Sequence, residues 1–342
     1  MEFKQVKIED VADVTKLAGF EFTKYIKYNE TGEIIALRAI NIRNNKLDLT
    51  DIKRIDKSIS ESLIRSKLYK DDIILTYTGN GAGAAAIIDE NDKYHLAPNI
   101  CKITPKEINP YYLYKYITSN KFQNEISNNI GGSGQPTIPM KTIRVLPISV
   151  PSRCNQTKIA KILKNIDDKI KLNNEINNNL LQLCRYKYDE LNKKYDEWDL
   201  VKINDLNLEV TDYVANGSFK SLADNVALYD DKEYALYVRN TDLKVNFTDK
   251  RKYVDQKSYE FLKKSKLKGG ELIISNVGDV GSVFICPHLN MPMTLGSNVI
   301  MLYETDSHYY NYFLYFFFTS VYGQYMIGGI TGGSAQPKFN KT

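Results

Sequence analysis

The chain is poor in the residues that build metal sites and nucleophilic active sites. Its 342 residues include four cysteines, three histidines and one tryptophan. The cysteines, Cys101, Cys154, Cys184 and Cys286, form no C-x-x-C pair, whereas a structural zinc site needs four clustered ligands. We therefore expect no metal site. Sparse, scattered thiols are typical of a protein that works in the reducing cytoplasm.

Long apolar runs and nucleotide-binding phrases are also missing. The chain starts Met1-Glu2-Phe3-Lys4-Gln5, without the apolar run of a signal peptide. Its most apolar stretch, residues 309–319, falls well short of the roughly 20 residues that span a bilayer, and we expect a core helix there rather than a membrane segment. There is no G-x-x-x-x-G-K-[ST] phosphate loop, so an ATP-driven motor is not encoded. No histidine stands in a recognisable triad context, and we expect no catalytic residue.

The remaining composition is that of a soluble globular protein. Hydrophobic residues make up 43% and charged residues 25% of the chain. The net charge of +5 permits an acidic partner such as nucleic acid without demanding one. The length predicts about two domains.

A repeated phrase makes the two-domain prediction firmer. Residues 132–136 (GSGQP) return as residues 333–337 (GSAQP), an offset of 201, and Arg38 pairs with Arg239 at the same offset. Further matches at an offset of 199 require a single two-residue gap. One module is therefore written twice, and a period of this length indicates duplicated domains rather than a solenoid. Diverged duplicates usually read two different targets with one geometry.

Each copy is predicted to mix strands and helices. It begins with a short half-buried strand, continues to a strand that carries an arginine, then to an apolar strand that ends in glycine, and then to a helix that the repeated loop closes. The first strand is expected at residues 6–11 and 201–206, and the strand with the arginine at 36–38 and 237–239. The apolar strand is expected at 72–79 and 271–278, and the helix at 110–128 and 308–326.

The segment between the copies follows a different pattern. Residues 155–195 contain no Gly or Pro, and apolar residues recur at steps of three and four, which predicts an amphipathic helix of coiled-coil type, roughly 60 Å long. The expected seam is Ile159, Leu163, Ile166, Ile170, Asn173, Asn177, Leu180, Cys184 and Leu191. Such a stripe needs a partner helix. The two asparagines either fix the register of that pairing or are solvated at its edge. The fold class is thus α+β, with two similar mixed α/β domains separated by a long helix.

Two phrases that resemble catalytic motifs fail on their context. Residues 79–84 (GNGAGA) fit a dinucleotide-binding pattern, but the other copy keeps only a strand–turn–strand pattern, so we expect a hairpin. Asn109-Pro110-Tyr111-Tyr112 resembles the N-P-P-[YF] motif of amino-methyltransferases without its second proline. We interpret Asn109-Pro110 as a helix start.

Binding chemistry remains. Arg can grip guanine and Asn or Gln can grip adenine through two hydrogen bonds, while Lys and Arg hold phosphates. The candidate DNA contacts are Arg38, Asn41, Arg43, Lys53, Arg54, Thr78, Asn80, Gln135, Arg239, Asn240, Lys250, Arg251, Asn276 and Gln336. The alternative is that the basic clusters are solvated faces. Because the glycine-rich loop is nearly identical in both copies, we expect it to support structure and the divergent stretches to read the bases.

At the central helix a resemblance becomes specific. Residues 155–163 (NQTKIAKIL) and 167–173 (DDKIKLN), with the preceding 146–151 (LPISVP), resemble the spacer helix of type I restriction–modification specificity subunits. Asn155 stands where Glu is usual. The Gly-Gly-Ser-x-Gln-Pro phrase that ends each copy matches the same family.

The resemblance implies two target-recognition domains, residues 1–152 and 197–342, and a spacer helix over residues 153–196. Each domain would read one half of a split, asymmetric site in double-stranded DNA. Two modification subunits would methylate adenine, and a motor–nuclease subunit would cut unmodified DNA. The resemblance places S-adenosylmethionine, ATP and Mg on those partners, with no cofactor on this chain, and implies a cytoplasmic protein without membrane contact.

One departure from the family pattern concerns the second spacer helix. At the 201 offset Thr342 corresponds to Lys141, so the second copy stops before that helix. We expect a shortened gene product, a truncated chain, or pairing with a helix from a second copy or another donor. Two alternatives remain: a non-productive subunit that acts as an interaction or anti-restriction protein, and, less favoured, a standalone adenine methyltransferase that uses residues 109–112.

Overall fold

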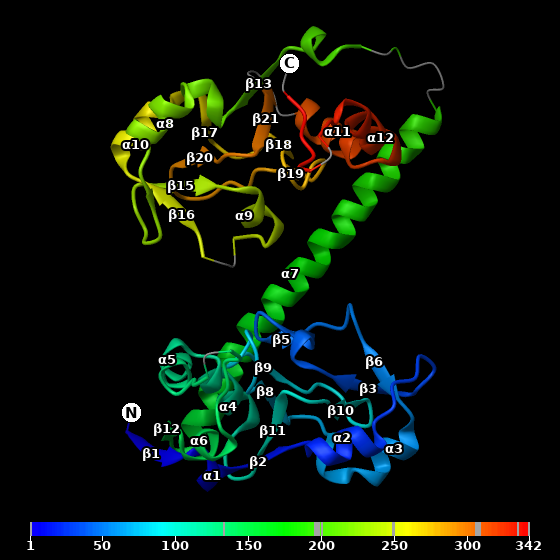
Figure 1. Ribbon diagram of the computed structural model, residues 1–342, viewed down its shortest axis with the longest axis vertical. Helices are drawn as coiled ribbons and strands as arrows, with labels where there is room; N and C mark the ends of the chain where they lie inside the picture. Colours follow the sequence, from blue (N-terminus) through cyan, green and yellow to red (C-terminus); the bar gives the residue numbers. More distant parts are fainter. Residues whose placement is uncertain are drawn as a thin grey trace. The chain divides into compact units, whose positions relative to one another are not determined.

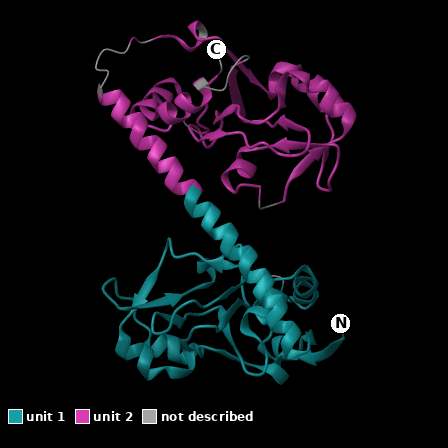
Figure 2. Ribbon diagram, turned by 180° about the vertical axis from the view of Figure 1, so that it is seen from behind, with its two compact units in different colours: residues 1–176 teal, residues 177–342 magenta. Residues whose placement is uncertain are grey.

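The chain forms two compact units joined by one long helix. The computed structural model describes residues 2–132, 134–194, 199, 201–247, 250–304, 309–333 and 335–340 (Figure 1). The units are residues 1–176 and 177–342 (Figure 2). Helix α7 (Arg153–Lys194) has 42 residues, begins in the first unit and ends in the second. The predicted long helix is confirmed over these residues; residues 195 and 196 lie outside the described part of the chain.

Unit 1 contains two four-stranded sheets and two short pairs of strands. The first sheet has the order β2-β11-β8-β9, with bounds Ala12–Lys16, Ile100–Pro105, Ile73–Thr76 and Ala85–Ile87. The second has the order β6-β3-β10-β7, with bounds Lys53–Ile55, Ile34–Leu37, Tyr94–Leu96 and Lys67–Leu68; β3 and β10 run parallel. Strand β1 (Phe3–Lys7) pairs antiparallel with β12 (Pro147–Pro151) just before α7.

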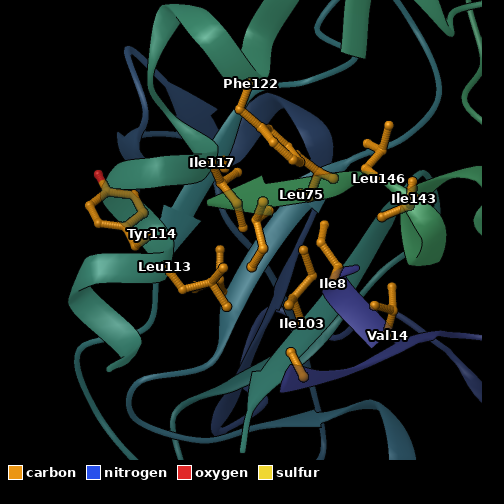
Figure 3. Packing of buried hydrophobic residues seen from close by; sticks show 14 of the residues in the cluster. Ile8, Val14, Leu75, Ile103, Leu113, Tyr114, Ile117, Phe122, Ile143 and Leu146 are labelled. Carbon is orange, nitrogen blue, oxygen red and sulfur yellow. The ribbon is translucent and has the colours of Figure 1, made fainter. Parts of the chain in front are cut away.

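Helices α4 (Pro110–Ile117), α5 (Asn120–Asn128) and α6 (Met140–Val145) cover the first sheet. Figure 3 shows Leu113, Ile117 and Phe122 from these helices meeting Leu75 and Ile103 of the sheet. Phe122 is fully buried. The remaining helices of unit 1 are short: α1 (Ile8–Val11), α2 (Gly19–Tyr25) and α3 (Lys57–Ser62).

Unit 2 repeats this architecture, as the duplicated phrase predicts. Its first sheet, β13-β21-β18-β19, spans Leu208–Asp212, Val299–Glu304, Leu272–Ser275 and Val283–Ile285. Its second, β14-β16-β15-β20-β17, spans Leu228–Tyr229, Lys252–Val254, Ala235–Val238, Met293–Leu295 and Lys266–Leu267, again with one parallel pair, β15 and β20. Its helices are α8 (Phe219–Asn225), α9 (Asn240–Lys244), α10 (Gln256–Phe261), α11 (Tyr309–Phe318) and α12 (Val321–Ile330).

The two strands expected at the start of the copies differ from the structure. The strand expected at residues 6–11 ends at Lys7, and α1 follows because Ile8 and Val11, three residues apart, turn to the same buried side. The Asp10 carboxylate accepts the Lys7 backbone N–H at 2.8 Å and caps this turn. In the other copy, residues 203–205 form a short 3-10 helix rather than a strand.

The single helix expected after each apolar strand is two helices. The break falls at Ser119 and Ser320, whose hydroxyls accept the backbone N–H groups of the second helix and cap it. The expected start at Asn109 is confirmed: its side chain accepts the Tyr112 N–H at 3.0 Å, and Pro110 occupies the first turn. No helix among the described residues is long and apolar enough to cross a bilayer.

Candidate nucleic-acid interface

Three loops of unit 1 are linked to one another at one edge of the module. The turn between β8 and β9 meets the repeated glycine loop, where the Gly79 N–H donates to the Pro136 carbonyl at 2.8 Å and Thr78 bridges to Thr137. The hairpin β4–β5 (Ile42–Arg43 and Lys46–Leu47) lies beside β9, the strand that follows this turn (Figure 1). The edge therefore gathers three polar loops that are far apart in the sequence.

The glycine loop has the same geometry in both units. Gly132 and Gly333 have φ angles of 98° and 93°, which L side chains rarely adopt. A Cβ at these positions would lie 2.8 Å from the Gln135 carbonyl oxygen and 2.6 Å from that of Gln336. Both glutamine side chains are exposed. The loop is thus a fixed backbone that presents one amide side chain in each unit.

Among the described residues, the hairpin β4–β5 has no counterpart in unit 2. Asn44 and Asn45 form its turn with φ angles of 50° and 54°, as two-residue hairpins of this type require. The Asn45 side chain accepts the Ala85 N–H at 3.2 Å, and its carbonyl accepts the Tyr114 hydroxyl, so the hairpin is held against β9 and α4. Arg43, with 67% of its side chain exposed, pairs with Asp48 at 3.1 Å.

Unit 2 has helix α9 where unit 1 has the hairpin. Asp279, in the turn after β18, accepts from Lys244 at 2.6 Å, from Asn240 at 3.2 Å and from Ser282. These donors, Lys244 first, lower the pKa of the Asp279 carboxyl to about 2. The same turn also contacts the repeated glycine loop of unit 2, because the Gly278 N–H donates to the Pro337 carbonyl at 2.9 Å. A carboxylate thus joins the divergent element of unit 2 to the shared loops.

Several predicted contacts belong to the scaffold. Asn41 is fully buried; it accepts the Arg38 N–H and donates to the carbonyls of Asp48 and Asp51. In this conformation its amide is not available to a base edge. Arg38 itself donates to the backbone and carboxylate of Asp51.

Arg239 is held in the same way. Its Nε and Nη2 donate to the buried Asp242 carboxylate at 2.9 and 2.7 Å, and Nη2 also donates to the Lys250 carbonyl. Asp242 caps the backbone of Arg239 as Asn41 caps that of Arg38. The Arg251 guanidinium donates to the Phe247 carbonyl and closes the loop after α9.

The remaining predicted residues divide into two groups. Arg43, Thr78, Asn80 and Gln135 lie on the linked loops of unit 1, and Asn276 and Gln336 lie on the equivalent loops of unit 2. Asn240 of α9 donates to Asp279 beside them. Lys53 and Arg54 lie on β6, outside these loops, and Arg54 donates to the Gly32 carbonyl at 3.3 Å. DNA contact by any of the set stays a prediction.

Sequence reasoning missed three residues that organise this edge: Asn45, Lys244 and Asp279. The Asn44-Asn45 pair between Ile42 and Leu47 carried a hairpin signal, since consecutive asparagines between apolar residues favour such turns. No comparable signal marked Lys244 and Asp279, which are 35 residues apart in the sequence.

Helix α7 packs on each unit with one side. In unit 1, Gln156 accepts the Asn109 N–H at 2.8 Å and Asp167 binds Tyr111 and Lys115. In unit 2, Tyr188 lies 5.4 Å from Phe313, centroid to centroid, and is buried.

The predicted seam of α7 is largely exposed. Ile159 packs against the core of unit 1 and Leu163 is half-buried, but the exposed fractions of Ile166, Ile170, Leu180 and Leu191 range from 46 to 53%. Asn173, Asn177 and Cys184 are exposed too. Within unit 2 this side borders an apolar groove of about 800 Å³, lined by Leu180, Leu181 and Cys184 of α7 and by Phe247, Tyr315 and Phe316.

The phrases that resembled catalytic motifs have structural uses. Residues 79–84 form the turn of the β8–β9 hairpin, as expected. Asn109 caps α4, and the Tyr112 hydroxyl donates to the Ser149 carbonyl at 2.5 Å. Among the described residues no group of three or more His, Cys, Asp or Glu side chains could hold a metal ion.

The fold defines a duplicated protein: two modules share one scaffold and differ at the element beside the shared loops. The family described as "Type I restriction modification DNA specificity domain" matches residues 1–182. The chain belongs to this family.

Curated relatives are specificity subunits of type I restriction enzymes. The chain is 26% identical to the EcoBI specificity subunit of Escherichia coli over 127 residues, which is 36% of this chain and 27% of that protein. It is 24% identical to the HindI specificity subunit of Haemophilus influenzae over 191 residues, 54% of this chain and 39% of that protein. The chain thus spans well under half the length of these relatives. A crystal structure of the type I S subunit from M. genitalium covers 96% of this chain and 79% of its own, with 14% identity and a TM-score of 0.48.

Proposed function

We propose that this chain selects the DNA sequence for a type I restriction–modification complex. Unit 1 reads one half of a bipartite, asymmetric site in double-stranded DNA, and unit 2 reads the other. Partner subunits methylate adenine at the chosen site and restrict DNA that lacks the methyl group. The chain carries out no chemistry itself and acts in the cytoplasm.

The observation that carries this proposal is the pattern of shared and divergent features in the two units. Both have the same kind of sheet order, the parallel strand pair and the glycine loop. Beside that loop, unit 1 has the β4–β5 hairpin with Arg43 and Lys46, whereas unit 2 has α9 tied to Asp279. Major-groove readout needs different donors and acceptors for different bases. Two different polar elements on one scaffold are suited to two different half-sites.

The partners follow from the exposed side of α7. An apolar stripe of this length is stabilised when another helix covers it. We propose that two modification subunits, and a helix from another chain or a second copy of this one, use the stripe and the neighbouring groove. A motor–nuclease subunit completes the complex. S-adenosylmethionine, ATP and Mg would bind those partners.

The test is methylation mapping with reconstituted modification subunits. The wild-type chain is expected to direct methylation to a two-part motif. Arg43→Ala with Lys46→Ala should relax or change one part only, and Asn240→Ala with Asp279→Asn the other part only. Methylation at single-part or unrelated sites would contradict the proposal. Stable binding of modification subunits without any methylation would instead support a non-productive, sequestering subunit.

A further inference from the structure

Helices α5 and α12 occupy equivalent places in the two units and have the same inner side. The Gln123 side-chain amide donates to the Gly83 carbonyl at 3.0 Å, and that of Gln324 donates to the Gly281 carbonyl at 2.8 Å. The isoleucine three residues further on is buried in each helix. The two helices therefore dock on their own modules through the same contacts.

Their outer sides have opposite chemistry. On α5 the outward positions are polar: Asn120, Lys121, Asn124, Glu125 and Asn128. At the same positions, 201 residues later, α12 has Val321, Tyr322, Tyr325, Met326 and Gly329. We name the set Val321, Tyr322, Tyr325, Met326, Gly329 and Ile330 the α12 face. The exposed fractions are 92% for Val321, 75% for Tyr325 and 62% for Ile330.

In unit 1, the segments that follow α5 leave the outward side of this helix uncovered. In unit 1 residues 140–176 follow α5, and its outward residues stay exposed or, at Glu125, half-buried. Lys121 reaches that later segment only with the end of its side chain, as its ammonium lies 3.2 Å from the Ser149 hydroxyl. Contiguous exposed apolar patches mark interaction sites. The apolar α12 face is therefore expected to bind a partner that is not part of its own module.

The chemistry of the face restricts its partner. Residues 319–337 contain no charged side chain, so neither phosphates nor a charged protein surface has a counterpart here. A partner that meets both units alike would not use a face that only unit 2 has. The ligand must be apolar, uncharged and bound once per chain, and a second copy of α12 meets each requirement.

We propose that the α12 face associates with the α12 face of a second copy in an antiparallel helix pair. A two-fold axis between positions 325 and 326 places Tyr325 against Met326 of the second copy. It also places Tyr322 against the second copy's Gly329, and Val321 against its Ile330. A Cβ added to Gly329 would meet no described atom within 4 Å, so this position leaves an open notch for the tyrosine ring. The face is complementary to itself, as an isologous contact requires.

The area of the face predicts weak association. An aromatic side chain buries roughly 150–250 Å², and the exposed parts of all the side chains of the face add up to about 500–600 Å² per copy. Two copies would bury about 1,000–1,200 Å², at the lower limit of specific interfaces. We expect half-association at roughly 10–100 µM chain.

Sedimentation velocity of the full chain without DNA, over about 1–200 µM, tests this. The wild type should shift from monomer to dimer. Tyr325→Lys should abolish the shift, while the matched substitution Asn124→Lys on α5 should leave it unchanged. Gly329→Gln fills the notch, where an added Cβ meets no described atom within 4 Å, and is expected to weaken association at least about tenfold.

A substitution on the exposed apolar side of α7 shows which of the two apolar surfaces, the α12 face or this side of α7, mediates association. With Ile166→Asp the concentration-dependent shift should remain, because the α12 face is intact. A wild type that stays monomeric over this range overturns the proposal. Association that persists in both Tyr325→Lys and Gly329→Gln also overturns the proposal. The same holds if Ile166→Asp is the only substitution that removes association. Since no DNA or partner subunit is present, these outcomes are independent of the proposed selection of a DNA sequence.

Discussion

Replacing Gly132 by alanine tests whether the repeated loop is a fixed scaffold. The φ angle of 98° is one that alanine adopts only under strain, and the new Cβ would lie 2.8 Å from the Gln135 carbonyl oxygen. Strained backbone of this kind costs about 1–3 kcal/mol. The close contact adds to that cost unless the loop moves. We therefore expect the Gly132→Ala loop to open locally.

The hydrogen bonds of the loop show where opening would appear. Thr137 and Gly131 exchange two backbone hydrogen bonds, of 2.9 and 3.0 Å, and the Gly79 N–H donates to the Pro136 carbonyl. Hydrogen exchange at the Thr137 and Gly79 amides should accelerate by roughly 5- to 150-fold, the factor that corresponds to about 1–3 kcal/mol. Urea unfolding of unit 1 should shift by no more than this amount.

Gly131→Ala is the matched control. No described atom lies within 4 Å of its added Cβ and its φ is not positive, so we expect a change within about 0.5 kcal/mol. If exchange in Gly132→Ala equals that in Gly131→Ala, the reasoning that links the repeated phrase to a fixed backbone is refuted.

Three further predictions concern the core, the carboxylate of unit 2 and the DNA contact. Phe122→Ala should destabilise unit 1 by about 3–5 kcal/mol, seen in calorimetry as a lower transition for that unit alone; an unchanged thermogram would contradict its place in the core. Because Lys244 and Ser282 hold the pKa of Asp279 near 2, its stabilising contribution should be complete above about pH 4 and fade as the pH falls toward 2. Urea midpoints of Asp279→Asn should lack that pH dependence. Arg43→Ala should weaken DNA binding and make the log–log salt dependence shallower by about 0.9, and an unchanged slope would exclude a phosphate contact.

The repeat predicted the fold well at the level of modules. The offset of 201 implied two copies of one architecture, and in both units the equivalent strands are paired in the same order. The order itself was not readable from the sequence, because the parallel pairing of β3 with β10 joins segments about 60 residues apart without a local signal. The helix break at Ser119 was visible in principle, since serine before an apolar segment is a capping signal.

The candidate interface was harder to predict because its residues serve two purposes. Arg38, Asn41 and Arg239 have the side chains that read bases, and yet they bind carbonyls and carboxylates of their own loops. The sequence identifies a side chain that can donate hydrogen bonds, but it does not identify the acceptor that this side chain meets after folding. Asp279 illustrates the opposite case, since an ordinary acidic residue becomes important only when folding brings α9 beside it.

The stripe of α7 was predicted as a helix seam, and the helix is confirmed. Its period of three and four residues identifies an apolar side but does not say what covers it. In the chain alone this side is mostly exposed from Ile166 onward.

The most direct test of the central claim is a methylation map of DNA treated with modification subunits and either the wild-type chain or a variant altered in one unit. The account predicts a two-part adenine-methylation motif in which Arg43→Ala with Lys46→Ala changes one part and leaves the other intact. A motif with a single part, or a change in both parts from substitutions in unit 1 alone, would contradict it.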